Sequence, residues 1–380
     1  MRMGSMPASR SAPVTRPPKR RPLASTMWAS VEIRRSCKPV AKPNSPTRRR
    51  ASLVSEVLVV HVAASALEPI FSEILAALQE RGIESDFFDA SAPLDPQFAD
   101  KKVVIDIGGW GRPEHIEAAR AAGVQLWQVV GYGLDHLALD EVMASGIPLA
   151  RIPGTSTAIP LAEHAMFLLL SVVKQANLAR PALMEQHFFD GDAGELRDKT
   201  MVILGVGASG RELARMARGF GMRVVGVDIL DSNAVDLDAL GIDAYLPISS
   251  LGQALAQADV VSLHLPLTSR TRHTLNASTL AELKSGAIVI NVARGPLIDE
   301  AALIEALRSG HVAGAGLDVF EVEPLPLDSP LLGMPNVVVT PHWAAATRAT
   351  MTRRAHMAAG NAARVLSGEN PDYRVLPEHL

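Results

Sequence analysis

The stretch Val202-Ile-Leu-Gly-Val-Gly-Ala-Ser-Gly210 decides the fold class of this chain, because an apolar strand runs directly into the pattern Gly-x-Gly-x-x-Gly. A helix-forming segment follows at 211–220, and a second apolar strand follows at 224–227. A strand on each side of a glycine-rich turn, with a helix between them, is typical of a βαβ unit. The pattern therefore predicts an α/β protein with a parallel sheet.

The glycines of this stretch also predict a ligand. Gly205 allows a tight turn, Gly207 lets the backbone approach a pyrophosphate, and Gly210 lets the helix pack closely on the strand. Phosphates are attracted to the free N–H groups at the start of the helix. Asp228, eighteen residues after Gly210, can accept hydrogen bonds from both ribose hydroxyls and would repel a 2′-phosphate. We therefore expect the turn to bind a dinucleotide, and we expect NAD rather than NADP. The alternative to dinucleotide binding is a tight βαβ turn without a ligand.

Length and composition exclude several classes of protein. The chain has 380 residues, enough for two domains, and its high apolar content of 48% with only 4% aromatics suits a parallel sheet. The single cysteine, Cys37, excludes an internal disulfide and a zinc cluster built on cysteines. No apolar run reaches the length of a membrane span. We expect a cytoplasmic protein without a metal and without membrane association.

The charge is unevenly distributed. Residues 1–50 hold 13 Lys and Arg and one acid, whereas the rest of the chain holds 24 basic and 39 acidic residues. Residues 1–52 are predicted to be a disordered basic tail, either a solvated segment, a targeting segment or an anion-binding arm. An acidic body argues against nucleic-acid binding.

Strands and helices alternate after the tail, which predicts parallel sheets. The strands are predicted at 57–62, 103–107, 124–130, 149–152, 201–204, 224–227, 244–246, 260–264, 287–292, 313–319 and 337–340. The longer helices are predicted at 67–81, 113–122, 158–189 with a kink at Pro181, 211–220 and 347–366.

Three polar residues follow three late strands of this pattern. Arg294 follows 287–292, Glu323 follows 313–319, and His342 follows 337–340. Ligands of open parallel sheets bind beyond the carboxyl ends of the strands. There an arginine suits a substrate carboxylate, and a histidine supported by a carboxylate suits proton transfer to a carbonyl oxygen. Taken singly, each residue could equally be an ordinary surface group.

Several stretches together give the chain its resemblance to a known family. It resembles the D-2-hydroxyacid dehydrogenases, which include glyoxylate/hydroxypyruvate reductases and phosphoglycerate dehydrogenase. The matching stretches are Gly133-Leu-Asp-His-Leu-Ala-Leu-Asp140, Pro160-Leu-Ala-Glu-His164, the glycine-rich turn, 258–266, Asn291-Val-Ala-Arg-Gly-Pro296, Gly316-Leu-Asp-Val-Phe-Glu-Val-Glu-Pro324 and Thr340-Pro-His342.

This resemblance implies two doubly wound parallel-sheet domains, a Rossmann NAD domain at 156–344 inserted into a split flavodoxin-like substrate domain at 53–155 and 345–380. It implies that Arg294, Glu323 and His342 are catalytic, with Glu321 a weaker candidate than Glu323 for the partner of His342. It implies substrate contacts from Tyr132, Gly133 and Arg294. It implies cofactor contacts from Gly205, Gly207, Ala208, Ser209, Gly210, Asp228, His264, Pro266, Thr271, Val292, Ala293 and Asp318. A homodimer is also implied.

The chain departs from the family at positions that bear on the substrate. The loop Gly108–Gly111 replaces the arginine-bearing loop of phosphoglycerate dehydrogenases, which argues against a phosphorylated substrate. Trp343 stands where a smaller aliphatic residue is usual, which would narrow the pocket. The sequence thus predicts an NAD-dependent reductase of a small 2-oxo acid such as glyoxylate or hydroxypyruvate. The alternative is an NAD-sensing binding protein on the same scaffold, like the co-repressors of this family.

Overall fold

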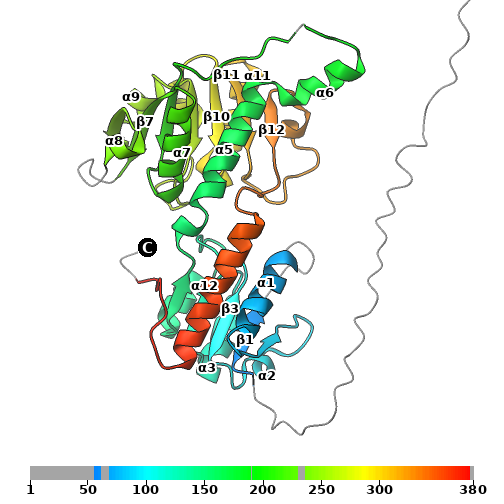
Figure 1. The fold of residues 1–380 in the computed structure, drawn as a ribbon, viewed down its shortest axis with the longest axis vertical. Coiled ribbons are helices and arrows are strands. Elements are labelled where there is room, and N and C mark those ends of the chain that lie inside the picture. The colour runs from blue at the N-terminus through cyan, green and yellow to red at the C-terminus, as the bar shows by residue number, and fades with distance from the viewer. Residues whose placement is uncertain (1–54, 61–67, 190, 230–235, 377–380) are drawn as a thin grey trace, which may run out of the picture. The chain divides into compact units, whose positions relative to one another are not determined.

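The computed structural model describes residues 55–60, 68–189, 191–229 and 236–376, which belong to one compact unit. The predicted disordered tail at 1–52 lies outside the described residues. Within them the chain forms two sheets, and all strand pairs in both are parallel, as the alternation of strands and helices predicts (Figure 1).

The first sheet has the order β2-β1-β3-β4-β5 and the second the order β12-β11-β10-β9-β6-β7-β8. The strands of the first sheet are β1 (Val57–Val60), β2 (Ser85–Phe87), β3 (Val103–Asp106), β4 (Leu126–Val129) and β5 (Leu149–Arg151). The strands of the second are β6 (Thr200–Leu204), β7 (Arg223–Asp228), β8 (Ala244–Pro247), β9 (Val260–Leu263), β10 (Ala287–Asn291), β11 (Val312–Leu317) and β12 (Val337–Val339). The sequence pattern missed β2, a short strand at the edge of its sheet, because three half-exposed residues carry no periodicity.

Helices cover both faces of each sheet. They are α1 (Glu68–Gln79), α2 (Leu94–Phe98), α3 (Pro113–Ala122), α4 (Leu139–Ser145), α5 (Ala158–Val173), α6 (Ala176–Met184), α7 (Ala208–Gly219), α8 (Leu237–Leu240), α9 (Leu251–Leu255), α10 (Ala277–Ala281), α11 (Glu300–Arg308) and α12 (Arg348–Leu366). A short 3₁₀ turn, η1 (Gly154–Ser156), precedes α5.

Alternation along the buried strands builds a core on each face. In β6, Met201 and Ile203 pack toward α5 and α7, while Val202 and Leu204 pack toward α9, α10 and α11. Side chains of successive strand residues point to opposite faces, so a strand buried on both sides is apolar throughout. This explains why the uninterrupted apolar run before the glycine-rich turn is a central strand.

The last helix returns to the first sheet. Figure 1 shows α12 beside α1, and both helices pack over β1 and β3. Ala355, Ala358 and Ala362 of α12 are fully buried in that core. The second sheet therefore comes in the chain between the strands of the first sheet and the helix α12 that packs on them, which confirms the predicted fold class.

The predicted helix at 158–189 is wrong as a single kinked helix. It is two helices, and the break lies at Gln175, whose φ of 53° is left-handed, rather than at Pro181. The buried stripe of α5 ends at Val173, whereas α6 has no buried residue. Packing on the sheet therefore determines where α5 stops, and Pro181 lies inside the second helix.

The same two helices bear on the expectation about membranes. Within the described residues, no single helix has both the length and the apolar character needed to cross a bilayer. Only α5 and α6 taken together would meet that criterion, and the chain bends by 46° between them.

Candidate active site at the carboxyl ends of the strands

The glycine-rich turn joins β6 to α7, and two of its glycines have the roles predicted for them. Gly205 has a φ of +99°, which only glycine adopts without strain. A Cβ on Gly210 would lie 2.0 Å from the carbonyl oxygen of Gly205, so helix and strand could not pack this closely. A Cβ on Gly207 would meet no described atom within 4 Å. The need for glycine at 207 thus stays a prediction that rests on an approaching pyrophosphate.

Asp228 ends β7 next to this turn. One of its carboxylate oxygens accepts from the amide of Val206 at 2.6 Å and the other from the amide of Ile229 at 2.7 Å. The carboxylate is thereby fixed beside the turn at which a dinucleotide would dock. The predicted contact of Asp228 with the ribose stays a prediction.

His264 links the strand end of β9 to the start of α7. Its Nδ1 lies 3.0 Å from the hydroxyl of Ser209, and its Nε2 lies 3.0 Å from the hydroxyl of Ser262. Burial lowers the pKa of His264 to about 4, so the ring is neutral at physiological pH. Two of the predicted cofactor residues, Ser209 and His264, are thus joined to each other. Ala208 is the first residue of α7.

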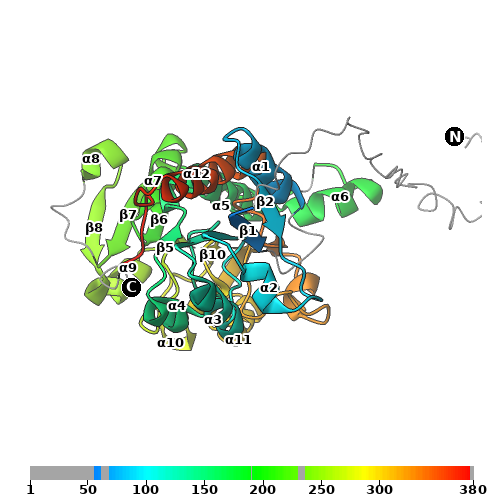
Figure 2. The same ribbon diagram turned by 90° about the horizontal axis from the view of Figure 1, so that it is seen from below.

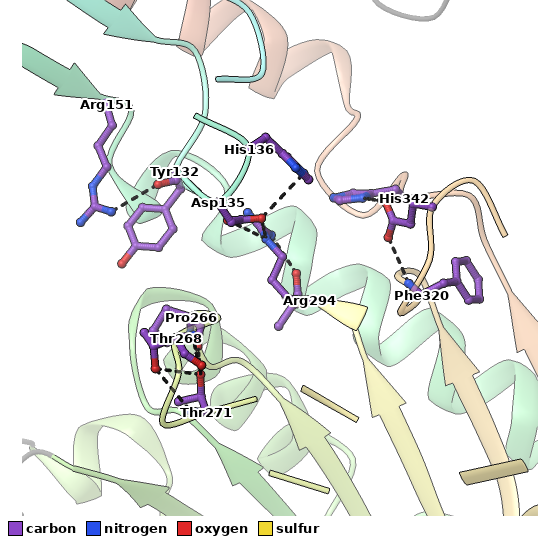
Figure 3. A network of polar contacts seen from close by, with 12 residues as sticks. Tyr132, Asp135, His136, Arg151, Pro266, Thr268, Thr271, Arg294, Phe320 and His342 are labelled. Carbon is purple, nitrogen blue, oxygen red and sulfur yellow. Dashed lines mark hydrogen bonds and ion pairs between the residues drawn. The ribbon is translucent and has the colours of Figure 1, made fainter. Parts of the chain in front are cut away.

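The loop after β9 is shaped by a small hydroxyl network (Figure 3). The hydroxyl of Thr271 donates to the carbonyl of Pro266 at 2.7 Å and accepts from the amide of Thr268 at 2.8 Å. Pro266 is exposed at the tip of this loop. The predicted pair Pro266 and Thr271 therefore form one turn, and their contact with adenosine stays a prediction.

Arg294 is positioned from both sides. The side chain of Asn291, the last residue of β10, accepts from the amide of Ala293 and donates to the carbonyl of Arg294, which fixes the turn. Val292, at the start of this turn, is 4% exposed. Arg294 Nε lies 3.2 and 3.0 Å from the two carboxylate oxygens of Asp135. Burial alone would raise the pKa of Asp135, but the charge and hydrogen bonding of Arg294, a backbone hydrogen bond and the charge of His136 together hold it below its usual value.

Gly133 makes room for this arginine. A Cβ on Gly133 would lie 1.8 Å from an Nη of Arg294, so the guanidinium lies against the bare backbone of the loop after β4. Figure 3 shows Asp135 of that loop facing Arg294, whereas Tyr132 lies beside Arg151. The carbonyl of Tyr132 accepts from Arg151 at 3.3 Å. Within the described part of the chain, the amides of Tyr132 and Gly133 donate to no protein acceptor.

His342 and Glu323 form a pair. Nδ1 of His342 lies 2.8 Å from Oε2 of Glu323, whose other oxygen accepts from the amide of Phe320 at 3.0 Å. Burial alone would raise the pKa of Glu323, but the hydrogen bond and charge of His342, the Phe320 amide and Arg294 outweigh it and lower that pKa. An ionised carboxylate only accepts hydrogen bonds, so Nδ1 carries a proton and Nε2 is left for a substrate.

The structure also decides between the two candidate glutamates. Glu321 lies 2.7 Å from Nε2 of His273 and 3.3 Å from an Nη of Arg272, away from His342. Because β12, β11 and β10 are neighbours in the sheet, the ends of these three strands bring His342, Glu323 and Arg294 to one edge. The predicted trio is thus assembled, with Glu323 as the partner of His342.

Asp318 lies beneath the turn that carries His342. Its side chain has no exposed surface and accepts from the hydroxyl of Thr340 at 2.6 Å and from the amides of Trp343 and Ala344 at 2.8 and 2.9 Å. The amide of His342 also donates to its carbonyl at 2.8 Å. The contact of Asp318 with a nicotinamide carboxamide, expected from the resemblance, has no support in this arrangement, because the carboxylate is enclosed by protein donors.

The lowered pKa of Asp318 predicts how the free energy of unfolding depends on pH. Burial would raise this pKa, but the hydrogen bonds from His164, Thr340 and the two amides bring it below the ordinary value of 3.8. The charged carboxylate therefore stabilises the fold at neutral pH, and this contribution is lost as the pH falls through the pKa of the folded state. We expect Asp318→Asn to lower the free energy of unfolding by about 2–3 kcal/mol near neutral pH and by less below about pH 4.

Urea unfolding followed by circular dichroism over this pH range measures the difference. Asp238→Asn is the control, because Asp238 is an exposed carboxylate on α8. This variant should change the free energy of unfolding little. A destabilisation by Asp318→Asn that is the same at every pH would contradict the assigned charge state.

The sequence pattern missed three residues of this region. Asp135 holds Arg294, and His136 beside it stacks on Trp110 with ring centroids 4.3 Å apart and planes at 7°. His164 of α5 lies 2.8 Å from the Thr340 hydroxyl and 3.4 Å from Asp318. Asp135 follows β4, so the rule of strand ends that identified Arg294 would also have identified Asp135 had it been applied to the first sheet.

Comparison with known proteins gives this arrangement a context. The family described as D-isomer specific 2-hydroxyacid dehydrogenase, NAD binding domain, matches residues 166–344. A glyoxylate reductase of Korarchaeum cryptofilum is 36% identical over 264 residues, which are 68% of this chain and 77% of that protein. A D-3-phosphoglycerate dehydrogenase of Bacillus subtilis is 40% identical over 223 residues, which are 57% of this chain but only 41% of that longer protein.

Solved structures resemble it over most of its length. A D-isomer specific 2-hydroxyacid dehydrogenase from Xanthobacter autotrophicus Py2, in complex with NADPH and MES, has a TM-score of 0.69 and 32% identity, covering 85% of this chain and 99% of that one. A glyoxylate reductase from Paecilomyes thermophila has a TM-score of 0.70 and 27% identity, covering 86% of this chain and 100% of that one.

Proposed function

Since the chain belongs to the D-isomer-specific 2-hydroxyacid dehydrogenase family and is an NAD-dependent oxidoreductase, we propose that it reduces a small 2-oxo acid of the glyoxylate or hydroxypyruvate kind to the D-2-hydroxy acid. The observation that carries this proposal is the assembly of Arg294, Glu323 and His342 at three neighbouring strand ends. An arginine and a protonated histidine at one edge supply what a 2-oxo acid needs, a cation for its carboxylate and a proton for its carbonyl oxygen.

Each residue has a task that follows from its contacts. The Nε of Arg294 is bound to Asp135, and one Nη donates to the carbonyl of Ala293 at 2.8 Å. The outer hydrogens of its two Nη groups are left for the substrate carboxylate, and the amides of Tyr132 and Gly133 add donors. Glu323 fixes the orientation of the His342 ring through the contact at Nδ1. His342 then donates a proton from Nε2 to the carbonyl oxygen of the substrate.

The residues around the glycine-rich turn fit a nicotinamide dinucleotide. The left-handed turn at Gly205, the close packing at Gly210 and the start of α7 form a cradle for a pyrophosphate, and Asp228 lies beside it. When bound, the reduced cofactor supplies a hydride to the carbonyl carbon, so that 2-oxo acid, NADH and one proton give 2-hydroxy acid and NAD⁺. Ala208, Ser209 and His264 would line the phosphate side of the cradle.

The charge of Asp228 is expected to set the preference of the enzyme for NADH over NADPH. Its carboxylate would bind the ribose hydroxyls of NADH and repel the phosphate of NADPH. We expect Asp228→Ser to lower the ratio of kcat/KM for NADH to that for NADPH by about 10-fold or more, because one pair of charges at close range contributes 1–2 kcal/mol. Steady-state kinetics with both cofactors measures the ratio. Asp238→Ser, on the exposed face of α8, is the control, and an unchanged ratio in Asp228→Ser would contradict the assignment.

The proposed activity is tested by NADH oxidation with glyoxylate, hydroxypyruvate and pyruvate. Turnover of at least one of them, with chiral analysis showing the D-hydroxy acid for the two larger substrates, is the expected result. Binding of NADH without turnover of any 2-oxo acid would contradict it. That outcome would favour the alternative of an NAD-sensing protein, which the comparisons do not favour because the relatives are named as reductases and dehydrogenases.

We also propose a homodimer, on the strength of an apolar surface at α6. Leu183 and Met184 of this helix are 58% and 76% exposed, and Phe188 just beyond it is 59% exposed. Figure 2 shows α6 reaching away from the helices that cover the second sheet. Burying such side chains against a second copy would be favourable. Sedimentation equilibrium of the full chain tests the proposal, and a monomer at micromolar concentration would contradict it.

A further inference from the structure

A further cationic side chain, Arg354, lies within electrostatic reach of Arg294. Arg354 lies in the second turn of α12 and is partly buried. Its Nε is shielded from solvent and has no hydrogen-bond partner among the described residues. A buried donor without an acceptor is costly, so its presence calls for an explanation.

The register of α12 places Arg354 at the level of the loop 131–135 after β4, called the substrate loop because it carries the proposed substrate contacts Tyr132 and Gly133. Asn361 donates to the side chain of Gln128 in β4 at 2.7 Å. Arg354 lies seven residues before Asn361, on the same face of the helix and about 10 Å nearer the helix start. Gly131–Gly133 follow β4, which ends one residue after Gln128. Arg354 and Gly131–Gly133 therefore both lie beyond the carboxyl end of β4.

The direction of α12 agrees with this placement. The neighbouring Arg353 donates to the carbonyl of Ser156, in the turn that follows β5. The start of α12 is therefore at the carboxyl edge of the first sheet, where Gly133 contacts Arg294. Arg353 is engaged with that turn and with Thr350, whereas Arg354 projects from a different side of the helix.

The charges around Arg354 are not balanced. Burial, and then the positive charges of Arg294 and Arg353, lower the pKa of Arg354 to about 10, which still leaves it cationic at neutral pH. Arg294 is paired with Asp135, but among the described residues no carboxylate forms an ion pair with Arg354.

We propose that Arg354 is a second anion-binding residue of the substrate pocket, so that the enzyme also accepts 2-oxo acids with a second carboxylate and favours them over uncharged analogues of the same chain length. The inference rests on the proposed function, because Arg294 must hold the first carboxylate for Arg354 to receive the other. The guanidinium of Arg354 has no carboxylate partner among the described residues, and a planar guanidinium is the group that binds a carboxylate best. The reaction at the carbonyl is unchanged, and only the group at the far end of the substrate differs.

Matched pairs of substrates measure the effect of the second carboxylate on kcat/KM. Oxaloacetate and 2-oxobutanoate have the same carbon chain and differ in the terminal group, as do 2-oxoglutarate and 2-oxopentanoate. The wild type is expected to favour one dicarboxylate over its partner by about 10- to 100-fold in kcat/KM, the effect of a charge-assisted hydrogen bond. Arg354→Met is expected to remove this preference, mainly through KM, while changing the rate on the monocarboxylate by less than about 3-fold.

Two further variants keep the test decisive. Arg354→Lys keeps the charge without the fork and should retain part of the preference, which also decides the matter if Arg354→Met does not fold. Arg348→Met removes an exposed arginine of the same helix and should leave the preference intact. An equal loss on both members of a pair in Arg354→Met would show a structural role and overturn the inference.

The remaining outcomes separate this inference from the proposed function. Turnover of monocarboxylates without preference for a dicarboxylate would overturn the role of Arg354 alone. Absence of NADH oxidation with every 2-oxo acid would overturn both. A stronger preference for 3-phosphohydroxypyruvate than for the dicarboxylates would overturn the assignment of a carboxylate.

Discussion

Replacing His342 with asparagine is expected to lower kcat by about 10²- to 10⁴-fold, the contribution of a positioned general acid. His342 has a left-handed φ of 56°, a conformation that asparagine tolerates better than alanine. The variant therefore removes the proton donor while sparing the backbone of the turn. NADH binding, followed by fluorescence, should change little, because the glycine-rich turn and Asp228 lie on other strands.

The chain offers a matched control for this variant. His273 is also paired with a glutamate, since its Nε2 lies 2.7 Å from Glu321, but it has no place in the proposed mechanism. His273→Asn should keep kcat within a few-fold of the wild type. Equal kcat values for wild type and His342→Asn with a turned-over 2-oxo acid would exclude His342 as the proton donor.

Replacing Arg294 with methionine is expected to lower kcat/KM by about 10²- to 10⁴-fold, because two charge-assisted hydrogen bonds to the substrate carboxylate are lost together. Arg294→Lys keeps the charge but cannot form the bidentate pair. Its kcat/KM should therefore lie between those of the wild type and Arg294→Met. The loss should be accompanied by a higher KM, since the carboxylate is bound in the ground state as well as in the transition state.

The control for Arg294 comes from the surface of α11. Arg308 forms an exposed pair with Glu305, and Arg308→Met should leave the kinetics unchanged. Arg294→Met also leaves Asp135 without its partner, so a thermal melt is needed beside the kinetics. If Arg294→Met retained the wild-type kcat/KM, the proposed binding of the substrate carboxylate would be wrong.

Local sequence determined most of the second sheet and its cradle. The strand, the positive φ at Gly205 and the contact at Gly210 all follow from residues within ten positions of one another, because turn chemistry and side-chain alternation are local properties. The trio was predictable for a related reason. Parallel strands bring their carboxyl ends to one edge, so a residue that follows a strand is placed there wherever it stands in the chain.

What depended on contacts between distant segments was not predictable in this way. The end of α5 at Val173 follows from where its packing surface on the sheet ends, not from Pro181. Asp318 and Asp135 are similar residues at strand ends, yet one is enclosed beneath a turn and the other pairs with Arg294, 159 positions away in the chain. Nothing in the local pattern distinguishes these two carboxylates.

The sequence by itself therefore determined the fold class, the nucleotide cradle and the three residues proposed to act on the substrate. Tertiary structure decided which glutamate supports His342, what holds Arg294, and that Arg354 of the last helix lies at the level of the substrate loop. The physical reason is the range of the interactions involved. Backbone conformation and strand alternation are encoded within a few residues, whereas the pairing and burial of charges depend on which distant segments the packed core brings together.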